Sequence, residues 1–173
     1  IHRDLKPSNV MVGSFGEVQV MDWGLAKVLR RGKDASRDTK DSDTAISGVR
    51  TVRSAEQGLQ SEPGTAMGTP AYMSPEQARG EVGSLDERAD VFGLGAILCE
   101  VLTGGPPYTG KTTDEVYKKA AGSHLTEATA RIESCGADEK LIRIALWCLE
   151  PQKESRPRNA EVVAEAVAAY LAS

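Results

Sequence analysis

Apolar residues recur at two different spacings along the chain, and these spacings predict a short β-hairpin followed by helices. Residues 10–12 and 17–21 are short β-prone runs, and the turn sequence between them, residues 13–16, joins them into a hairpin. Nearly every position from 88 to 102 is apolar, as in a helix that is buried on most sides. Glycine and proline residues at 104–107 end this helix.

Three more segments have apolar residues at helical spacing on one face, and they predict helices at residues 113–121, 138–149 and 159–171. By contrast, residues 30–60 are rich in Ser, Thr, Asp, Lys and Gly and show little apolar periodicity, which predicts a mobile loop. Loops longer than ~15 residues are uncommon and tend to be functional. The expected fold is therefore mainly α, with a small β-hairpin near the N-terminal end.

Composition excludes several classes of protein. The chain has 173 residues and a net charge of −4, which excludes a basic nucleic-acid binder. No run approaches the ~20 apolar residues of a membrane span, so we expect no membrane contact within this chain and a cytoplasmic location, with a tether outside the chain left open. Three cysteines without CxxC spacing predict buried, reduced thiols.

The chain begins at Ile1, inside a dense motif, and we therefore expect it to be a fragment. Residues 2–9, HRDLKPSN, match the catalytic loop of protein kinases. Further along, in the order of that family, come four more matching motifs: Asp22-Trp23-Gly24, Ser74-Pro75-Glu76, Asp90-Val91-Phe92-Gly93 and Arg156-Pro157. The combination resembles the bacterial eukaryote-like serine/threonine protein kinases.

The resemblance implies that residues 1–173 form a partial protein kinase domain, namely the mostly helical C-terminal lobe, with the N-terminal lobe missing. Residues 22–76 then correspond to the activation segment, with a flexible insertion at about 30–66. This segment is long for the family. Counterparts of the glycine-rich loop, the strand lysine and its glutamate partner are absent from the sequence.

The implied reaction is the transfer of the ATP γ-phosphate to protein Ser or Thr hydroxyls. Such a transfer requires a positioned hydroxyl and neutralised charge. By resemblance, Asp4 orients the hydroxyl, Lys6 places a positive charge at the transferring phosphate, and Thr69 contacts Lys6. Asn9 and Asp22 match the positions that bind Mg²⁺, a cation that prefers oxygen ligands. ATP and Mg²⁺ are thus the expected cofactors, and Lys6, Asn9 and Asp22 are the residues expected to bind them.

Other matching residues have implied regulatory or structural roles. Arg3 corresponds to an arginine that receives the phosphate of a phosphorylated activation loop, for which Thr65 and then Ser61 are the first candidates. Glu76 and Arg156, 80 residues apart, are expected to form an ion pair, and Asp90 begins the central helix. Arg3, Glu76 and Arg156 also have a simpler interpretation as exposed surface charges. His2 is expected to pack rather than to titrate.

Two alternatives stay open. Residues 13–18, GSFGEV, resemble the end of a kinase glycine-rich loop, but Met11 stands where its first glycine would fall, and the position after the catalytic loop favours a hairpin. The second alternative is functional: the chain is a non-catalytic docking or scaffold module. Retention of Asp4, Lys6, Asn9 and Asp22 favours an enzyme, whose partners would be Ser- or Thr-containing proteins and the missing N-terminal lobe. Without that lobe, this chain alone is expected to be inactive.

Overall fold

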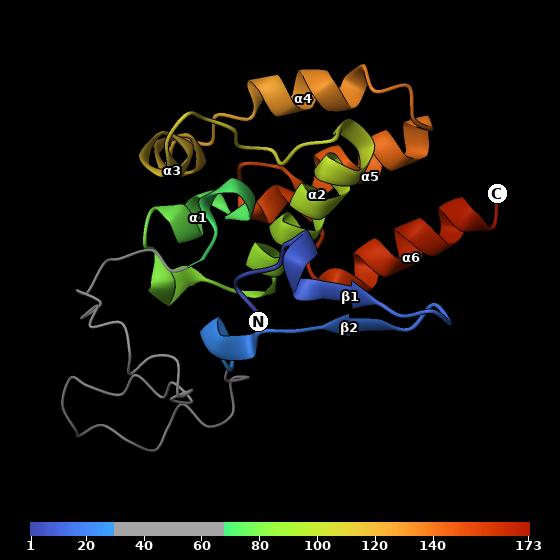
Figure 1. Cartoon of the computed structure of the whole chain (residues 1–173), viewed down its shortest axis with the longest axis horizontal. Helices are drawn as coiled ribbons and strands as arrows, with labels where there is room; N and C mark the ends of the chain where they lie inside the picture. The colour runs from blue at the N-terminus through green and yellow to red at the C-terminus, as the bar shows by residue number, and fades with distance from the viewer. Residues whose placement is uncertain (30–67) are drawn as a thin grey trace.

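A computed structural model describes residues 1–29 and 68–173 (Figure 1). The hairpin consists of β1 (Val10–Val12) and β2 (Val18–Val20), which pair antiparallel with Val10 opposite Val20. Phe15, in the turn between them, is 97% exposed. The predicted hairpin is therefore confirmed, although its strands are shorter and more exposed than those of a sheet packed on one face.

The helices of the described ranges are mostly those that the apolar pattern predicts. Their bounds are α1 Pro75–Ala78, α2 Glu87–Thr103, α3 Thr113–Ala121, α4 Thr126–Glu133, α5 Glu139–Cys148 and α6 Ala160–Leu171. Short 3₁₀ turns at Val82–Ser84 and Lys153–Ser155 lie between helices, and three more, at Pro7–Asn9, Trp23–Leu25 and Pro70–Tyr72, precede α1. The described residues are mainly α with one small hairpin, as expected.

Helix α2 lies in the middle of the molecule (Figure 1) and contributes more buried residues than any other helix of the described ranges. Its N-terminus is capped by the side chain of Asp86, which accepts a hydrogen bond from the Arg88 amide, and it ends at Gly104 with φ 78°, the left-handed cap that glycine adopts most easily. Phe92, on α2, is fully buried and stacks on Tyr108 with ring centroids 6.1 Å apart. Phe92 thus belongs to the core, as the apolar run at residues 88–102 predicts.

Two features differ from the sequence prediction. Helix α4 was not predicted, because Ala128 and Ile132 are its only buried residues and they leave a weak apolar pattern. The three cysteines are free thiols, but only Cys99 and Cys148 are buried, whereas Cys135 is partly exposed because it lies in the turn after α4. The expectation of buried thiols was thus wrong for Cys135.

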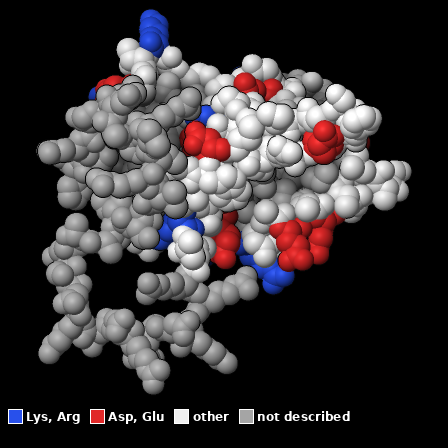
Figure 2. Space-filling view, turned by 60° about the horizontal axis from the view of Figure 1, so that its bottom comes forward, with Lys and Arg blue, Asp and Glu red and all other residues white. Residues whose placement is uncertain are grey.

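The surface of the described residues carries both acidic and basic side chains (Figure 2). On the face seen in Figure 2, acidic and basic side chains lie in separate small groups rather than in one continuous basic surface. No helix within residues 1–29 and 68–173 has the length and apolar character that crossing a membrane requires.

Candidate active site

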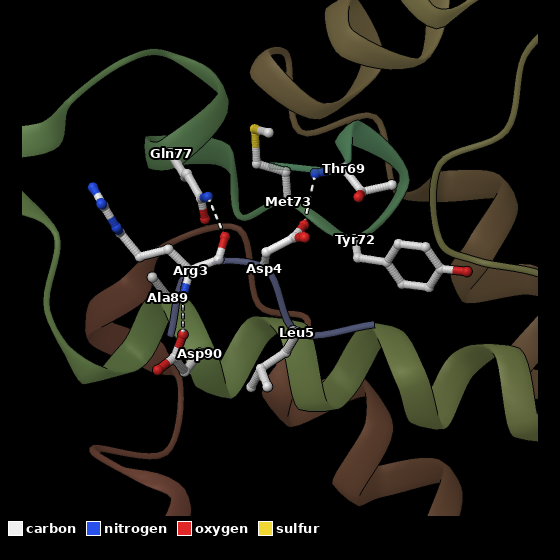
Figure 3. A pocket seen from close by; sticks show the side chains of 10 residues that line it. Arg3, Asp4, Leu5, Thr69, Tyr72, Met73, Gln77, Ala89 and Asp90 are labelled. Atoms are coloured by element: carbon white, nitrogen blue, oxygen red, sulfur yellow. Dashed lines mark hydrogen bonds between the residues drawn. The ribbon is translucent and has the colours of Figure 1, made fainter. Parts of the chain in front are cut away.

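The segment that leads into the site is held by α2. The amides of His2 and Arg3 donate to the two carboxylate oxygens of Asp90, at 2.7 and 2.8 Å, and the carbonyl of Arg3 accepts from Gln77 at 2.6 Å (Figure 3). Arg3 has a φ of 71°, in the left-handed region that costs a residue with a side chain roughly 1–2 kcal/mol. These hydrogen bonds stabilise that conformation, which turns the next residue, Asp4, toward Thr69.

The Asp4 carboxylate lies at the centre of a polar cluster. Its Oδ1 accepts from the amide of Thr69 at 2.9 Å, and its Oδ2 lies 2.9 Å from Nζ of Lys6. Nζ of Lys6 also donates to Oγ1 of Thr69 at 2.6 Å, which is the contact that the resemblance implies. Thr69 therefore binds both the carboxylate and the ammonium group, although it is 65 residues from Asp4 in the sequence.

The side chain of His2 packs beneath this cluster and is only 2% exposed. Its Nδ1 accepts from the amide of Asp4 at 3.2 Å, so Nε2 carries the proton and donates to the carbonyl of Met21 at 2.9 Å. The ring of Trp23 meets the His2 ring edge-on at 4.8 Å. His2 thus links residues 1–4 to the segment around Asp22, which agrees with a packing role.

Asn9 and Asp22 carry an amide oxygen and a carboxylate, and oxygen atoms are the ligands that Mg²⁺ prefers. The Nδ2 of Asn9 donates to the backbone carbonyl of Asp4 at 2.8 Å and to its Oδ2 at 3.2 Å, which leaves the Asn9 Oδ1 without a hydrogen bond among the described residues. The amide of Met21 donates to the carbonyl of Asn9 at 2.8 Å, so Asp22 follows directly from a residue held against Asn9. Asp22 is exposed and has a φ of 58°.

The described ranges contain no cluster of three or more His, Cys, Asp or Glu side chains that could enclose a metal ion. An amide oxygen and one carboxylate are the small protein contribution that Mg²⁺ commonly receives, with phosphate and water oxygens completing its shell. Trp23, which replaces the phenylalanine of the family motif, is 59% exposed and its indole N–H donates to the carbonyl of Val20. Its larger ring is therefore not enclosed by the described residues.

The Arg3 side chain points away from the Asp4 cluster. Its Nε donates to the carbonyl of Leu25, and burial lowers the pKa of its guanidinium while the charge of Asp90 opposes that shift. Both phosphorylation candidates, Ser61 and Thr65, lie outside the described residues, as does the expected insertion at about 30–66.

Glu76 and Arg156 form a buried bidentate ion pair. The two terminal nitrogens of Arg156 donate to the two carboxylate oxygens of Glu76, at 2.7 and 2.9 Å. The side chain of Arg156 is 0% exposed and that of Glu76 is 4% exposed. Arg156 also donates to the carbonyls of Arg88, Glu150 and Pro151, so all five of its N–H groups have acceptors. Its guanidinium lies 5.0 Å from the centre of the Phe92 ring.

This pair sets the ionisation of Glu76. Burial alone would raise the pKa of the Glu76 carboxyl, but hydrogen bonds and the positive charge of Arg156 outweigh burial and hold the pKa below its ordinary value of 4.5. The structure therefore brings together the two residues that the resemblance paired, and it anchors α1 to the segment before α6.

The sequence did not single out two of the contacts that hold the site. Gln77 supports Arg3, as described, and the hydroxyl of Tyr72 donates to Oε2 of Glu100 on α2 at 2.6 Å. Burial, followed by the hydrogen bond to Glu100, raises the pKa of Tyr72. Neither contact has a local sequence signal, because each joins residues at least 28 positions apart.

A small cavity separates Asp4 from α2, with lining residues that include Leu5, Met73 and Ala89 (Figure 3). Its volume of about 10 Å³ is roughly that needed for a single water molecule. The cavity is thus too small to hold a substrate or a nucleotide.

Comparison with known proteins defines the class. The model of a family described as the protein kinase domain matches residues 1–167. The chain therefore belongs to the protein kinase family.

Its relatives are bacterial serine/threonine kinases. The chain is 35% identical over 160 residues to serine/threonine-protein kinase PknB of Mycobacterium tuberculosis, covering 92% of this chain and 21% of the relative. It is 30% identical over 166 residues to the DNA damage-responsive serine/threonine-protein kinase RqkA of Deinococcus radiodurans, covering 95% of this chain and 20% of the relative. The chain spans about a fifth of the length of these relatives.

Proposed function

We propose that the protein containing this chain transfers the γ-phosphoryl group of Mg·ATP to serine or threonine hydroxyls of other proteins. The observation that carries the proposal is the Asp4–Lys6–Thr69 cluster, in which a carboxylate and an ammonium group are held together by one threonine. Membership of the protein kinase family supports it.

Each residue of the cluster has a role that follows from its chemistry. Asp4 accepts a hydrogen bond from the substrate hydroxyl, aligns its oxygen and takes its proton. Lys6 places a compact positive charge where negative charge gathers on the transferring group. Thr69 fixes both side chains, so the two charges do not have to be ordered during the reaction.

Asn9 and Asp22 are the residues that would hold Mg²⁺, since both carry side-chain oxygen atoms and the residue before Asp22 is hydrogen-bonded to Asn9. When bound, Mg·ATP supplies the phosphoryl group and a metal ion that neutralises its charge. We also propose that residues 1–173 form a partial kinase domain, with residues 22–76 as its activation segment and with Arg3 as the ligand of a phosphate on that segment.

We also expect residues 1–173 by themselves to be inactive. The sequence has no counterpart of the residues that cover ATP in the family, and losing both charge stabilisation and positioning lowers rates by at least ~10⁴. A cytoplasmic location is part of the proposal, supported by the free thiols of Cys99 and Cys148, which are typical of reducing compartments.

The test uses the complete gene product that contains residues 1–173, incubated with radiolabelled ATP, Mg²⁺ and a mixed protein substrate. We expect label on serine and threonine but not on tyrosine, and Asp4→Asn should lower the rate by about 10²–10⁴. Asp114→Asn is the matched control, because Asp114 is 73% exposed and pairs with Lys118 on the surface. If Asp4→Asn transfers phosphate as fast as this control, Asp4 does not orient the substrate hydroxyl, and if the gene product transfers no phosphate at all, the chain is better described as a docking module.

A further inference from the structure

A groove of about 530 Å³ lies between α4 and the C-terminal end of α5, and it shares no lining residue with the cavity behind Asp4. Its volume falls in the range of ligand-binding clefts. Leu125 and Leu149, which are 7% and 4% exposed, form its floor together with Leu146. All three pack against the main hydrophobic core, so the floor is fixed in place.

The groove exists because the wall that α4 contributes is made of small residues. Lining positions 126, 129, 130 and 133 are three or four apart and therefore lie on one face of α4. Three of them are threonine or alanine, which do not fill the space above the leucines. The result is an apolar trough, about as long as α4, that is open to solvent.

Two carboxylates lie toward the two ends of this trough. Glu133 and Glu150 are the charged residues that line it, and neither forms an ion pair within residues 1–29 and 68–173. Helices α4 and α5 run in opposite directions (Figure 1), so Glu133, at the end of α4, and Glu150, just after α5, are at opposite ends. Each carboxylate is close to a helix C-terminus, where a negative charge is unfavourable and a bound cation is favoured.

We propose that this groove binds a segment of a partner protein that carries one large apolar side chain between two lysines or arginines. The apolar side chain lies on the leucine floor, and each cation pairs with one carboxylate. Helix α4 rises about 10 Å from Thr126 to Glu133. An extended peptide covers that distance in three to four residues, so the two cations are four positions apart.

The proposal is tested with the complete gene product that contains residues 1–173 and the fluorescein-labelled peptide GSKSLSKSG, whose binding is followed by fluorescence anisotropy at low salt. We expect a Kd on the order of 0.1–1 mM, which is weak because one apolar contact and two exposed ion pairs carry the affinity. Control peptides replace the leucine by serine, or both lysines by glutamate. Circular dichroism verifies that every protein variant is folded.

Glu133→Gln and Glu150→Gln should each weaken binding about two- to fivefold, and the double variant by about the product. Ala130→Trp, at an exposed position, should fill the trough and weaken binding at least tenfold. Glu161→Gln, on the exposed surface of α6, is the matched control and should change nothing. Raising the salt concentration should weaken binding of the lysine peptide, because exposed charge pairs are screened.

Three results would overturn the proposal. Equal binding of the serine control peptide would mean that the protein attracts cations without using the groove, and absence of binding up to 1 mM would mean that the groove has no such ligand. The third is self-association of the wild-type chain that Ala130→Trp abolishes, because the occupant would then be a second copy of this chain. Since the readout is binding, its failure leaves the proposed kinase activity untouched.

Discussion

The side chain of Arg156 has a hydrogen-bond acceptor for every one of its N–H groups. Its five N–H groups reach one carboxylate and three backbone carbonyls, and Phe92 covers one face of the guanidinium. A charge buried in this way depends on its partner, because removing Glu76 would leave the guanidinium without a counter-charge in a place that water does not reach.

We therefore predict that Glu76→Gln and Arg156→Gln each lower the free energy of unfolding by about 3–5 kcal/mol. The double variant should cost less than the sum of the two, since the first change already breaks the pair. Denaturant unfolding measures all three values. The exposed pair Glu139–Arg143, at 3.8 Å, is the matched control and should show almost no coupling. Additive effects at Glu76 and Arg156 would contradict the buried pair.

The ionisation of Glu76 should make the stability of the protein depend on pH. Because the folded pKa of Glu76 is below its ordinary value of 4.5, its contribution to stability is complete above about pH 4.5 and is lost as the pH falls through the folded value. The difference in unfolding free energy between wild type and Glu76→Gln should thus shrink as the pH is lowered from 7 to 3. A difference that stays constant over this range would show that Glu76 is not paired.

Among the elements, α2 links the core to the site. Near its N-terminus Asp90 holds the amides of His2 and Arg3, and near its C-terminus Glu100 holds Tyr72. His2 and Arg3 come directly before Asp4 in the sequence, and Tyr72 comes shortly after Thr69. The position of α2 therefore determines where both halves of the Asp4–Lys6–Thr69 cluster lie.

Asp90→Asn should weaken this link selectively. A carboxylate accepts from both amides, whereas an asparagine has only one acceptor oxygen and leaves one of the two amides without a partner. We expect a loss of about 1–3 kcal/mol of stability and faster hydrogen exchange at His2 or Arg3. Glu87→Gln, another acidic residue in the first turn of α2, is the control. Unchanged exchange at both amides would contradict the anchoring role.

Most of these elements could be predicted from the sequence because their apolar patterns are strong. The pattern predicted α2 within one residue at each end and α3 at its observed bounds. Helix α4 was missed because two buried residues in eight give little periodicity, and its position depends on packing against α2 and α5. Arg131 shows that dependence, since its guanidinium donates to Thr103 and to the carbonyls of Gly105 and Pro106.

For the molecule as a whole, the resemblance paired residues that the fold then brought together, such as Lys6 with Thr69 and Glu76 with Arg156. The resemblance could not predict the hydrogen bonds that hold the site in place. Those of Gln77 with Arg3 and of Tyr72 with Glu100 form only after distant segments have packed. Nor could it predict the groove between α4 and α5, which requires a helix that the sequence pattern did not reveal.

We propose two separate roles in the site: Asp4 orients the substrate hydroxyl, whereas Asn9 and Asp22 hold Mg²⁺. The most direct test is the Mg²⁺ dependence of phosphoryl transfer by the complete gene product and two variants. We predict that Asp4→Asn lowers the maximal rate by about 10²–10⁴ without moving the Mg²⁺ concentration for half-maximal rate, whereas Asp22→Asn raises that concentration. A maximal rate that Asp4→Asn leaves unchanged, or identical Mg²⁺ curves for wild type and Asp22→Asn, would contradict this account.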